Sequence, residues 1–287
     1  MRYRSMLLVA AGALGVAHVV GVLTDAPILR QAEVFALALL LAYALFAGLP
    51  SPRWAVPAGL AVLIFDAVRT MPSGRVDYGW QVFRYEPLEL SGRLRDGLEL
   101  TWAALVVVLV LALVARRHAG RPSRWALVGA VLTGGLVLGY LAVRVAHGLR
   151  KARPAWAGDG GRSDSIEFVT AALTPPLVLA LGAIALATML VGQGRRLAAC
   201  GAGLLALAAM FHLDTAMALG PQRLSAYPVD PGVVFTQVFT FTPTLATAPA
   251  LTSAAELAGC LLLVVGLCGG RPERTGSAGG EPAPVDG

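Results

Sequence analysis

Eight apolar stretches follow one another along this chain of 287 residues. A helix needs about 20 mostly apolar residues to cross the hydrocarbon core of a bilayer. The sequence therefore predicts an all-α fold, a polytopic bundle of about eight transmembrane helices. The expected spans are 6–23, 34–49, 54–69, 98–115, 125–147, 168–191, 197–217 and 252–268.

Composition agrees with a membrane protein, because 56% of the residues are hydrophobic and only 14% are charged. The short second and third stretches could instead form one buried hairpin, but their polar flanks favour two spans. We expect residues 1–270 to form a single transmembrane domain. The segment 271–287 is rich in Gly, Pro and Ser, which predicts a disordered cytoplasmic tail.

The beginning of the chain has the charged residues of a signal peptide, Arg2 and Arg4, before an apolar run. The only suitable cleavage position follows Ala26 and would leave Pro27 next to it. Since the run is already long enough to span, we expect an uncleaved first helix.

Orientation follows from arginines in the short loops, which mark the cytoplasmic side. In a model with eight spans, one side collects Arg2, Arg4, Arg53, Arg116, Arg117, Arg121, Arg124, Arg195, Arg196, Arg271 and Arg274. Both termini are therefore expected in the cytoplasm. The chain has no Asn and a single Lys, Lys151, a usage typical of a GC-rich genome, so we expect a bacterial plasma (inner) membrane.

Loop lengths suggest two halves of four helices in parallel orientation, although no residue-level match between the halves supports a 4+4 repeat. Two outer loops are long, 70–97 and 218–251. The segment 231–251 carries no charge and is broken by prolines. We interpret it as a re-entrant or lid segment, with a ninth span as the alternative.

Ionisable side chains inside the apolar stretches are the main functional candidates, since a charge at the helix centre costs about 3 kcal/mol on insertion scales. By position, His18 and Asp66 lie about 18 Å from the cytoplasmic ends of their helices. The inner half has no comparable group. The candidate ligand- or proton-coupling residues are His18, Asp66, Arg69, Arg144, His147, His212 and Asp214.

Spacing places some of these candidates on common helix faces: Arg144 and His147 share a face with Tyr140, and Asp66 shares one with Arg69. If these faces turn inward, a polar vestibule opens to the outside above an apolar floor. The competing interpretation is structural, because arginines and acids near helix ends extend to the lipid headgroups. It applies to Arg69, Arg144, Glu99 and Glu167, whereas Glu256 is expected near the outer interface.

A buried histidine such as His18 has its own structural interpretation, a hydrogen bond that bridges two helices. Small residues, including the motif Gly135-x-x-x-Gly139, are expected to permit close helix approach. Pro175 and Pro176 are expected to bend their helix.

Several functions lack their required residues. The net charge of +6 comes from arginines between apolar runs, which argues against nucleic-acid binding. The spacing of Cys200, Cys260 and Cys268 fits neither a metal site nor a redox dithiol. The sequence has no Walker A, HExxH or GxSxG motif, and its single lysine lies in a loop, which excludes a retinal Schiff base.

Three hypotheses remain. The first is a transporter or permease-like protein, or a membrane subunit of a larger complex, without enzymatic activity or cofactor, in which His18, Asp66, Arg144 and His212 bind protons or an anionic ligand. The second is a membrane-embedded enzyme acting on a lipid-linked substrate at the outer leaflet, or a redox protein with haem bound by two of His18, His147 and His212. The third is a scaffold for partner proteins. Beyond the lipid bilayer, the sequence identifies no partner or ligand.

Overall fold

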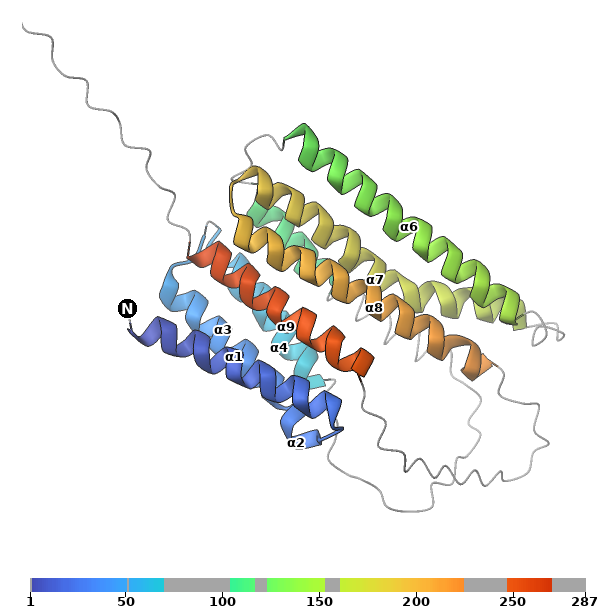
Figure 1. Cartoon of the computed structure of the whole chain (residues 1–287), viewed down its shortest axis with the longest axis horizontal. Coiled ribbons are helices and arrows are strands. Elements are labelled where there is room, and N and C mark those ends of the chain that lie inside the picture. Colours follow the sequence, from blue (N-terminus) through green and yellow to red (C-terminus); the bar gives the residue numbers. More distant parts are fainter. Residues whose placement is uncertain are drawn as a thin grey trace, which may run out of the picture.

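A computed structural model describes residues 2–50, 52–69, 104–116, 123–152, 161–224 and 247–269. The predicted loop 70–97, the segment 231–246 and the tail 271–287 lie outside these residues. The described part is helical throughout, with helices near each of the eight predicted stretches (Figure 1). They are α1 Arg2–Leu23, α2 Pro27–Arg30, α3 Ala32–Ala47, α4 Ala55–Arg69, the helix Ala104–Arg116, α6 Arg124–Ala152, α7 Gly161–Gly192, α8 Arg196–Leu224 and α9 Thr247–Cys268.

Five apolar segments are long enough to cross a membrane: Tyr3–Leu23, Pro27–Ala47, Arg124–His147, Leu173–Gly192 and Thr247–Cys268. Three shorter apolar helices accompany them, Ala55–Val68, Ala104–Arg116 and Arg196–His212. The chain is a multi-pass membrane protein by the length and composition of these helices. The second segment begins earlier than the predicted 34, because the short α2 precedes α3.

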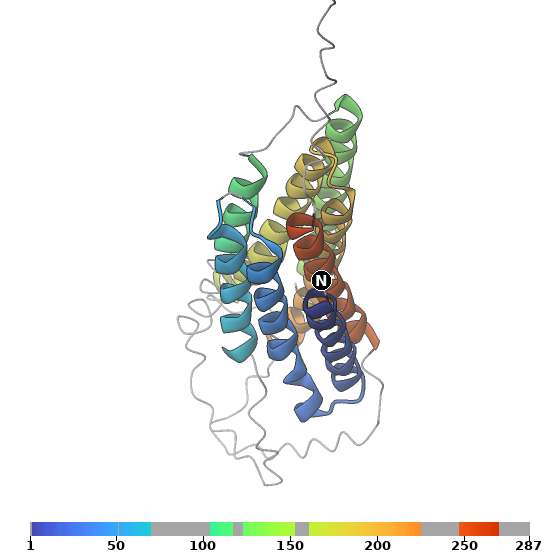
Figure 2. The same ribbon diagram turned by 90° about the vertical axis from the view of Figure 1, so that its left-hand side faces the viewer.

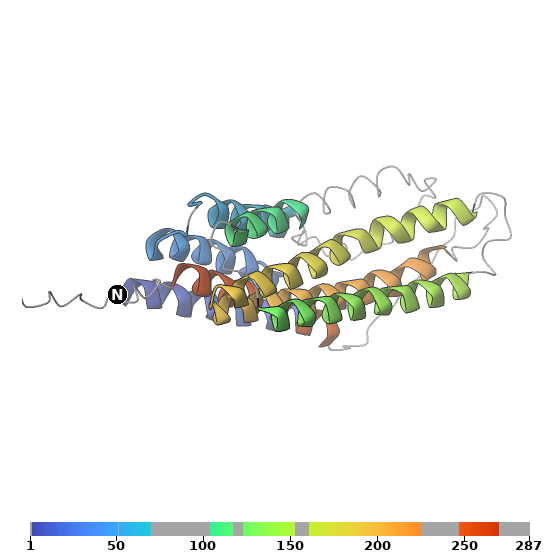
Figure 3. The ribbon, with the colours of Figure 1, turned by 90° about the horizontal axis from the view of Figure 1, so that it is seen from above.

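Helix α9 occupies the middle of the bundle, between α8 on one side and α1 and α3 on the other (Figures 1 and 2). Helix α4 packs on α3, and α6 packs on α7 and α8. The helix Ala104–Arg116 links the two sides, since Val110 lies against Gly59 of α4 and Val108 against Gly182 of α7. Seen from above, α6 lies along an edge of the bundle (Figure 3).

The core is built from small and aliphatic side chains, which allow the helices to pack closely. Its members include Leu40, Leu60, Val110, Leu186, Leu190, Ala202 and Leu263. Large apolar side chains also cover the outside, among them Phe35, Phe65, Val131 and Leu136. Such a surface is unfavourable in water, so it agrees with contact to lipid.

Helices α8 and α9 approach so closely that backbone contacts backbone. A methyl group added at Gly201 would lie 2.5 Å from the backbone nitrogen of Leu263 and 2.6 Å from the carbonyl oxygen of Gly259. One added at Gly266 would overlap the backbone nitrogen of Ala198. Glycine at these positions is therefore a steric requirement of the helix pair.

The predicted close approach at Gly135 and Gly139 is wrong for the described part of the chain. A methyl group added at either position would have no atom within 4 Å. Helix α6 instead buries Val137 against Ala180 and Ala209. Positions two residues apart lie roughly 200° apart around a helix, so the glycine face points away from this contact.

At one end of the bundle, the turn between α7 and α8 binds two other helices. The side-chain amide of Gln193 donates a hydrogen bond to the carbonyl oxygen of Ala115, at 2.5 Å, and the guanidinium of Arg195 donates one to that of Leu267, at 3.0 Å. These bonds satisfy carbonyls that a helix leaves unpaired at its C-terminus. The start of α1 lies at this end too. Cys268, the last residue of α9, and Arg4, near the start of α1, both act electrostatically on the same side chain, that of Tyr43.

The contact between α8 and α9 predicts a matched pair of substitutions. Gly201→Leu should destabilise the protein by about 1–3 kcal/mol or more, because the side chain would have to displace the backbone of α9. Gly203→Leu is the control, as Gly203 lies on the same helix with open space around it. Thermal unfolding in detergent should show a lower Tm for the first variant only, and equal Tm values would contradict the packing described.

Candidate functional site

The turn after α1 brings the side chains of Asp25 and Arg30 together. Asp25 has a left-handed backbone, with φ of 55°, and the amide of Ala26 donates to the carbonyl oxygen of Gly21 at 2.8 Å. This is the Schellman ending of a helix. Pro27 then begins α2, and the Arg30 side chain returns to Asp25, with 2.5 Å between nitrogen and oxygen. The chain reverses within a few residues and runs back beside α1.

As a result of this reversal, His18 contacts α2 and α3. Its Nδ1 lies 2.8 Å from the carbonyl oxygen of Arg30, and its Nε2 lies 3.6 Å from Oε2 of Glu33. The His18 side chain is only 8% exposed, whereas that of Glu33 is 33% exposed. His18 thus connects α1, α2 and α3 near one end of the bundle.

A second histidine and glutamate pair joins α8 and α9. Nε2 of His212 lies 2.6 Å from Oε1 of Glu256, which is a hydrogen bond as well as an ion pair when the imidazole is charged. The close packing at Gly201 and Gly259 sets the separation of the two helices and so allows this short contact. The His212 side chain is 46% exposed.

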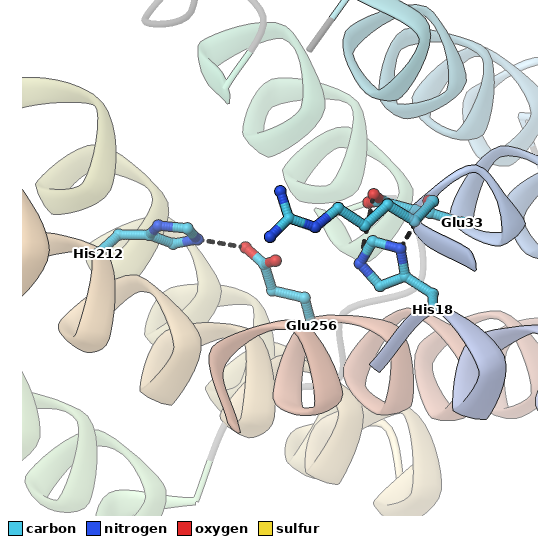
Figure 4. A network of polar contacts seen from close by, with 5 residues as sticks. His18, Glu33, His212 and Glu256 are labelled. Atoms are coloured by element: carbon cyan, nitrogen blue, oxygen red, sulfur yellow. Dashed lines mark hydrogen bonds and ion pairs between the residues drawn. The ribbon is translucent and has the colours of Figure 1, made fainter. Parts of the chain in front are cut away.

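The two pairs belong to one cluster (Figure 4). Glu256 lies between His212 and the pair formed by His18 and Glu33. The carboxyl groups of Glu256 and of Asp66, on α4, both act electrostatically on Glu33. We call these residues the His–Glu cluster: His18, Glu33, Asp66, His212 and Glu256. Five helices supply them, one residue each.

The His–Glu cluster has more acids than bases. Glu33 and Glu256 each face an imidazole, and Arg30 is paired with Asp25. Among the described residues, no group of three or more His, Cys, Asp or Glu side chains is arranged to hold a metal ion.

The structure places the predicted site residues in different surroundings. His18 and His212 lie in one cluster (Figure 4), and the carboxyl group of Asp66 acts electrostatically on Glu33 beside His18. Arg144 stacks on Tyr140, its neighbour one turn earlier on α6, with the guanidinium 5.9 Å from the ring centre, and His147 is exposed. The side chains of Arg69 and Asp214 lie outside the described part of the structure.

The apolar pattern does not identify Glu33 and predicts Glu256 only near the outer interface. Glu33 lies one residue before the predicted span, so this pattern places it in a loop. A usable signal was present, since Asp25 and Pro27 mark a tight reversal that returns Glu33 to the level of His18. Glu256 lies nine residues into α9, about 13 Å from its start, so it is inside the apolar segment.

No protein-family model, curated protein or solved structure matches the chain. Its class therefore rests on its own features: it is a multi-pass membrane protein in which two histidine and glutamate pairs join the helices.

The buried contacts of His18 predict a loss of stability on truncation. His18→Ala leaves the Arg30 carbonyl and the Glu33 carboxyl without this partner, which should cost about 1–3 kcal/mol. His147→Ala is the control, since His147 is exposed and should change stability by less than about 0.5 kcal/mol. Thermal unfolding in detergent measures both. An unchanged Tm for His18→Ala would mean that these contacts contribute nothing to stability.

Proposed function

We propose that the chain is a proton-coupled transporter and that the His–Glu cluster is its coupling site. The observation that carries this proposal is the presence of two histidine and glutamate pairs from four helices within apolar segments. Ionisable groups are costly in that position and commonly mark proton or ion pathways in membrane proteins. Histidine is the side chain whose charge changes near neutral pH.

The carboxyl groups of Glu33 and Glu256 support a cation as the transported substrate. An anionic ligand, the other option from the sequence, would have to approach both of these carboxyl groups. A cation would instead replace a proton at the carboxylates. Exchange of a proton for a cation is the simplest coupling that this charge pattern supports.

The contacts of the histidines favour proton chemistry over haem binding. A haem iron bound by two histidines needs a free ring nitrogen on each. Both ring nitrogens of His18 have an oxygen neighbour, the Arg30 carbonyl at Nδ1 and Glu33 at Nε2, so His18 offers no free nitrogen to an iron. His212 has Nε2 hydrogen-bonded to Glu256, which leaves Nδ1 as its nitrogen for a metal. Carboxylates beside imidazoles are typical of proton transfer and of ion pairing.

We further propose that both termini lie in the cytoplasm of a bacterial inner membrane and that the cluster faces outside. The turn between α7 and α8, which carries Arg195 and Arg196, lies at the end of the bundle opposite α2 (Figure 1), and this supports the orientation through the positive-inside rule. The parallel repeat of four helices stays a prediction.

Coupled transport is tested in proteoliposomes that enclose a pH-sensitive dye. Sodium, potassium, guanidinium and choline are added separately outside the vesicles. These ions stay charged, so they cannot cross the lipid as neutral bases and change the internal pH without the protein. At least one should drive proton movement. Glu256→Gln and His212→Gln should slow this movement about tenfold or more, which corresponds to about 1.4 kcal/mol of lost coupling.

The control for this assay is His118→Gln, which changes a histidine in the predicted basic loop 116–124 and should leave the proton movement unaltered. The proposal fails if none of the four cations moves protons, or if Glu256→Gln transports as the unmodified protein does.

Orientation is tested by cysteine labelling in a variant with Cys200, Cys260 and Cys268 replaced by alanine. Thr24→Cys reports on the end of the bundle near His18, and Arg196→Cys on the opposite end; both positions are exposed. A membrane-impermeant maleimide should label Thr24→Cys in intact cells and Arg196→Cys only after permeabilisation. The reverse pattern would place the cluster on the cytoplasmic side.

A further inference from the structure

One end of the bundle is strongly basic, the end that holds the turn between α7 and α8 (Figure 1). Each Asp and Glu of the described helices lies in the half of its helix that is farther from this end. Arg195 donates to the Leu267 carbonyl, and the other arginines there are exposed. The positive charge of this end is therefore not balanced by any described acid. We call it the arginine end, and its arginines are Arg4, Arg53, Arg116, Arg124, Arg195 and Arg196.

Two of these arginines begin neighbouring parallel helices at the same level. Val137 of α6 and Ala209 of α8 belong to one buried contact. Arg124 and Arg196 are the first residues of these helices, and each precedes the contact by the same number of residues. A positive charge at a helix N-terminus opposes the helix dipole, so neither arginine stabilises its own helix. Both side chains are exposed and point to a partner outside the bundle.

Aromatic side chains accompany the arginines. Trp125 is 84% exposed and follows Arg124, and Trp54 is 56% exposed and follows Arg53. These are both of the tryptophans among the described residues. Tyr3, also exposed, precedes Arg4 in the same way. Tryptophan and tyrosine side chains favour the headgroup level of a bilayer, where one face of the ring is apolar and the other is wet.

The position of these residues favours a lipid as the partner. Two of the long apolar segments begin at Tyr3 and at Arg124, so the arginines lie where a span leaves the hydrocarbon core. Phosphate groups of the lipids lie at that depth, and a guanidinium binds phosphate through two parallel hydrogen bonds. A soluble acidic protein would need arginines that extend beyond the membrane surface, and exposed tryptophans beside them would give it no matching group.

We propose that the arginine end binds the headgroups of anionic phospholipids, with Arg124, Trp125 and Arg196 as the main site. The two guanidiniums hold the lipid phosphate, and the indole packs on the glycerol and the upper part of the acyl chains. A lipid bound there bridges the starts of α6 and α8. This bridge matters for α6, which buries a smaller share of its apolar segment in the bundle than the other four long segments do.

Binding is measured on the full chain in a non-ionic detergent, by native mass spectrometry with added phosphatidylglycerol or phosphatidylcholine of the same acyl chains. An arginine near an anionic membrane surface contributes about fivefold in affinity. Arg124 and Arg196 together therefore predict a preference of about 25-fold for phosphatidylglycerol. Because a ligand stabilises the state that binds it, phosphatidylglycerol should also raise the Tm more than phosphatidylcholine does at equal concentration.

Arg124→Gln and Arg196→Gln should each weaken phosphatidylglycerol binding about fivefold and leave phosphatidylcholine binding unaltered. Both side chains are exposed, so the Tm without added lipid should stay the same. Arg124→Lys keeps the charge and should bind more tightly than Arg124→Gln. Arg144→Gln is the matched control, because it removes one arginine from the other end of α6 and should keep the preference of the unmodified protein.

Equal affinity for the two lipids would overturn the proposal, as would a preference for phosphatidylglycerol that survives the double change of Arg124 and Arg196 to glutamine. Inorganic phosphate and a polyglutamate peptide are added as competitors in separate samples. Displacement of the lipid by either one at millimolar concentration would also overturn it, since the arginine end would then be a general anion surface. Neither transport nor the side of the membrane that this end faces affects these measurements.

Discussion

A polar group on a helix in lipid needs a partner within the protein, and this constraint explains most of the contacts that join the helices. At one end of the bundle, His18 is satisfied by the Arg30 carbonyl and Glu33, and His212 by Glu256. At the other end, Gln193 and Arg195 satisfy helix carbonyls of neighbouring segments. Between these ends, small and aliphatic side chains fill the core. The positions of the helices relative to one another follow from pairing at the two ends and close packing between them.

Much of the helical architecture could be predicted from the sequence, because an apolar run of bilayer length has few alternatives to a helix. The depth of His18, Asp66 and His212 also followed from simple counting along the helices. Their partners did not. Glu256 meets His212 because Gly201 and Gly259 set how α8 and α9 cross, and this register is a property of two surfaces. The residue pattern of either helix alone does not predict this register.

Two expectations show what a motif leaves open. The glycines at 135 and 139 permit a close contact, yet α6 packs through Val137 on its opposite side, since the neighbouring helices offer Ala180 and Ala209 there. Arg144 and His147 were predicted to line a vestibule only if their shared face turned inward; Arg144 stacks on Tyr140 of the same face, and His147 is exposed. A residue pattern states which contacts are allowed, and the shape of the partner decides which of them form.

The backbone contact between α8 and α9 also limits how the bundle can move. With no side chain between Gly201 and Gly259, sliding of one helix along the other would force Cα and carbonyl atoms into each other, so the two helices behave as a single rigid body. His212 and Glu256 travel together within it. A change in the separation of the two histidine and glutamate pairs must therefore come from displacement of α1 and α3 against that body, and the reversal at Asp25 makes these two helices shift in concert.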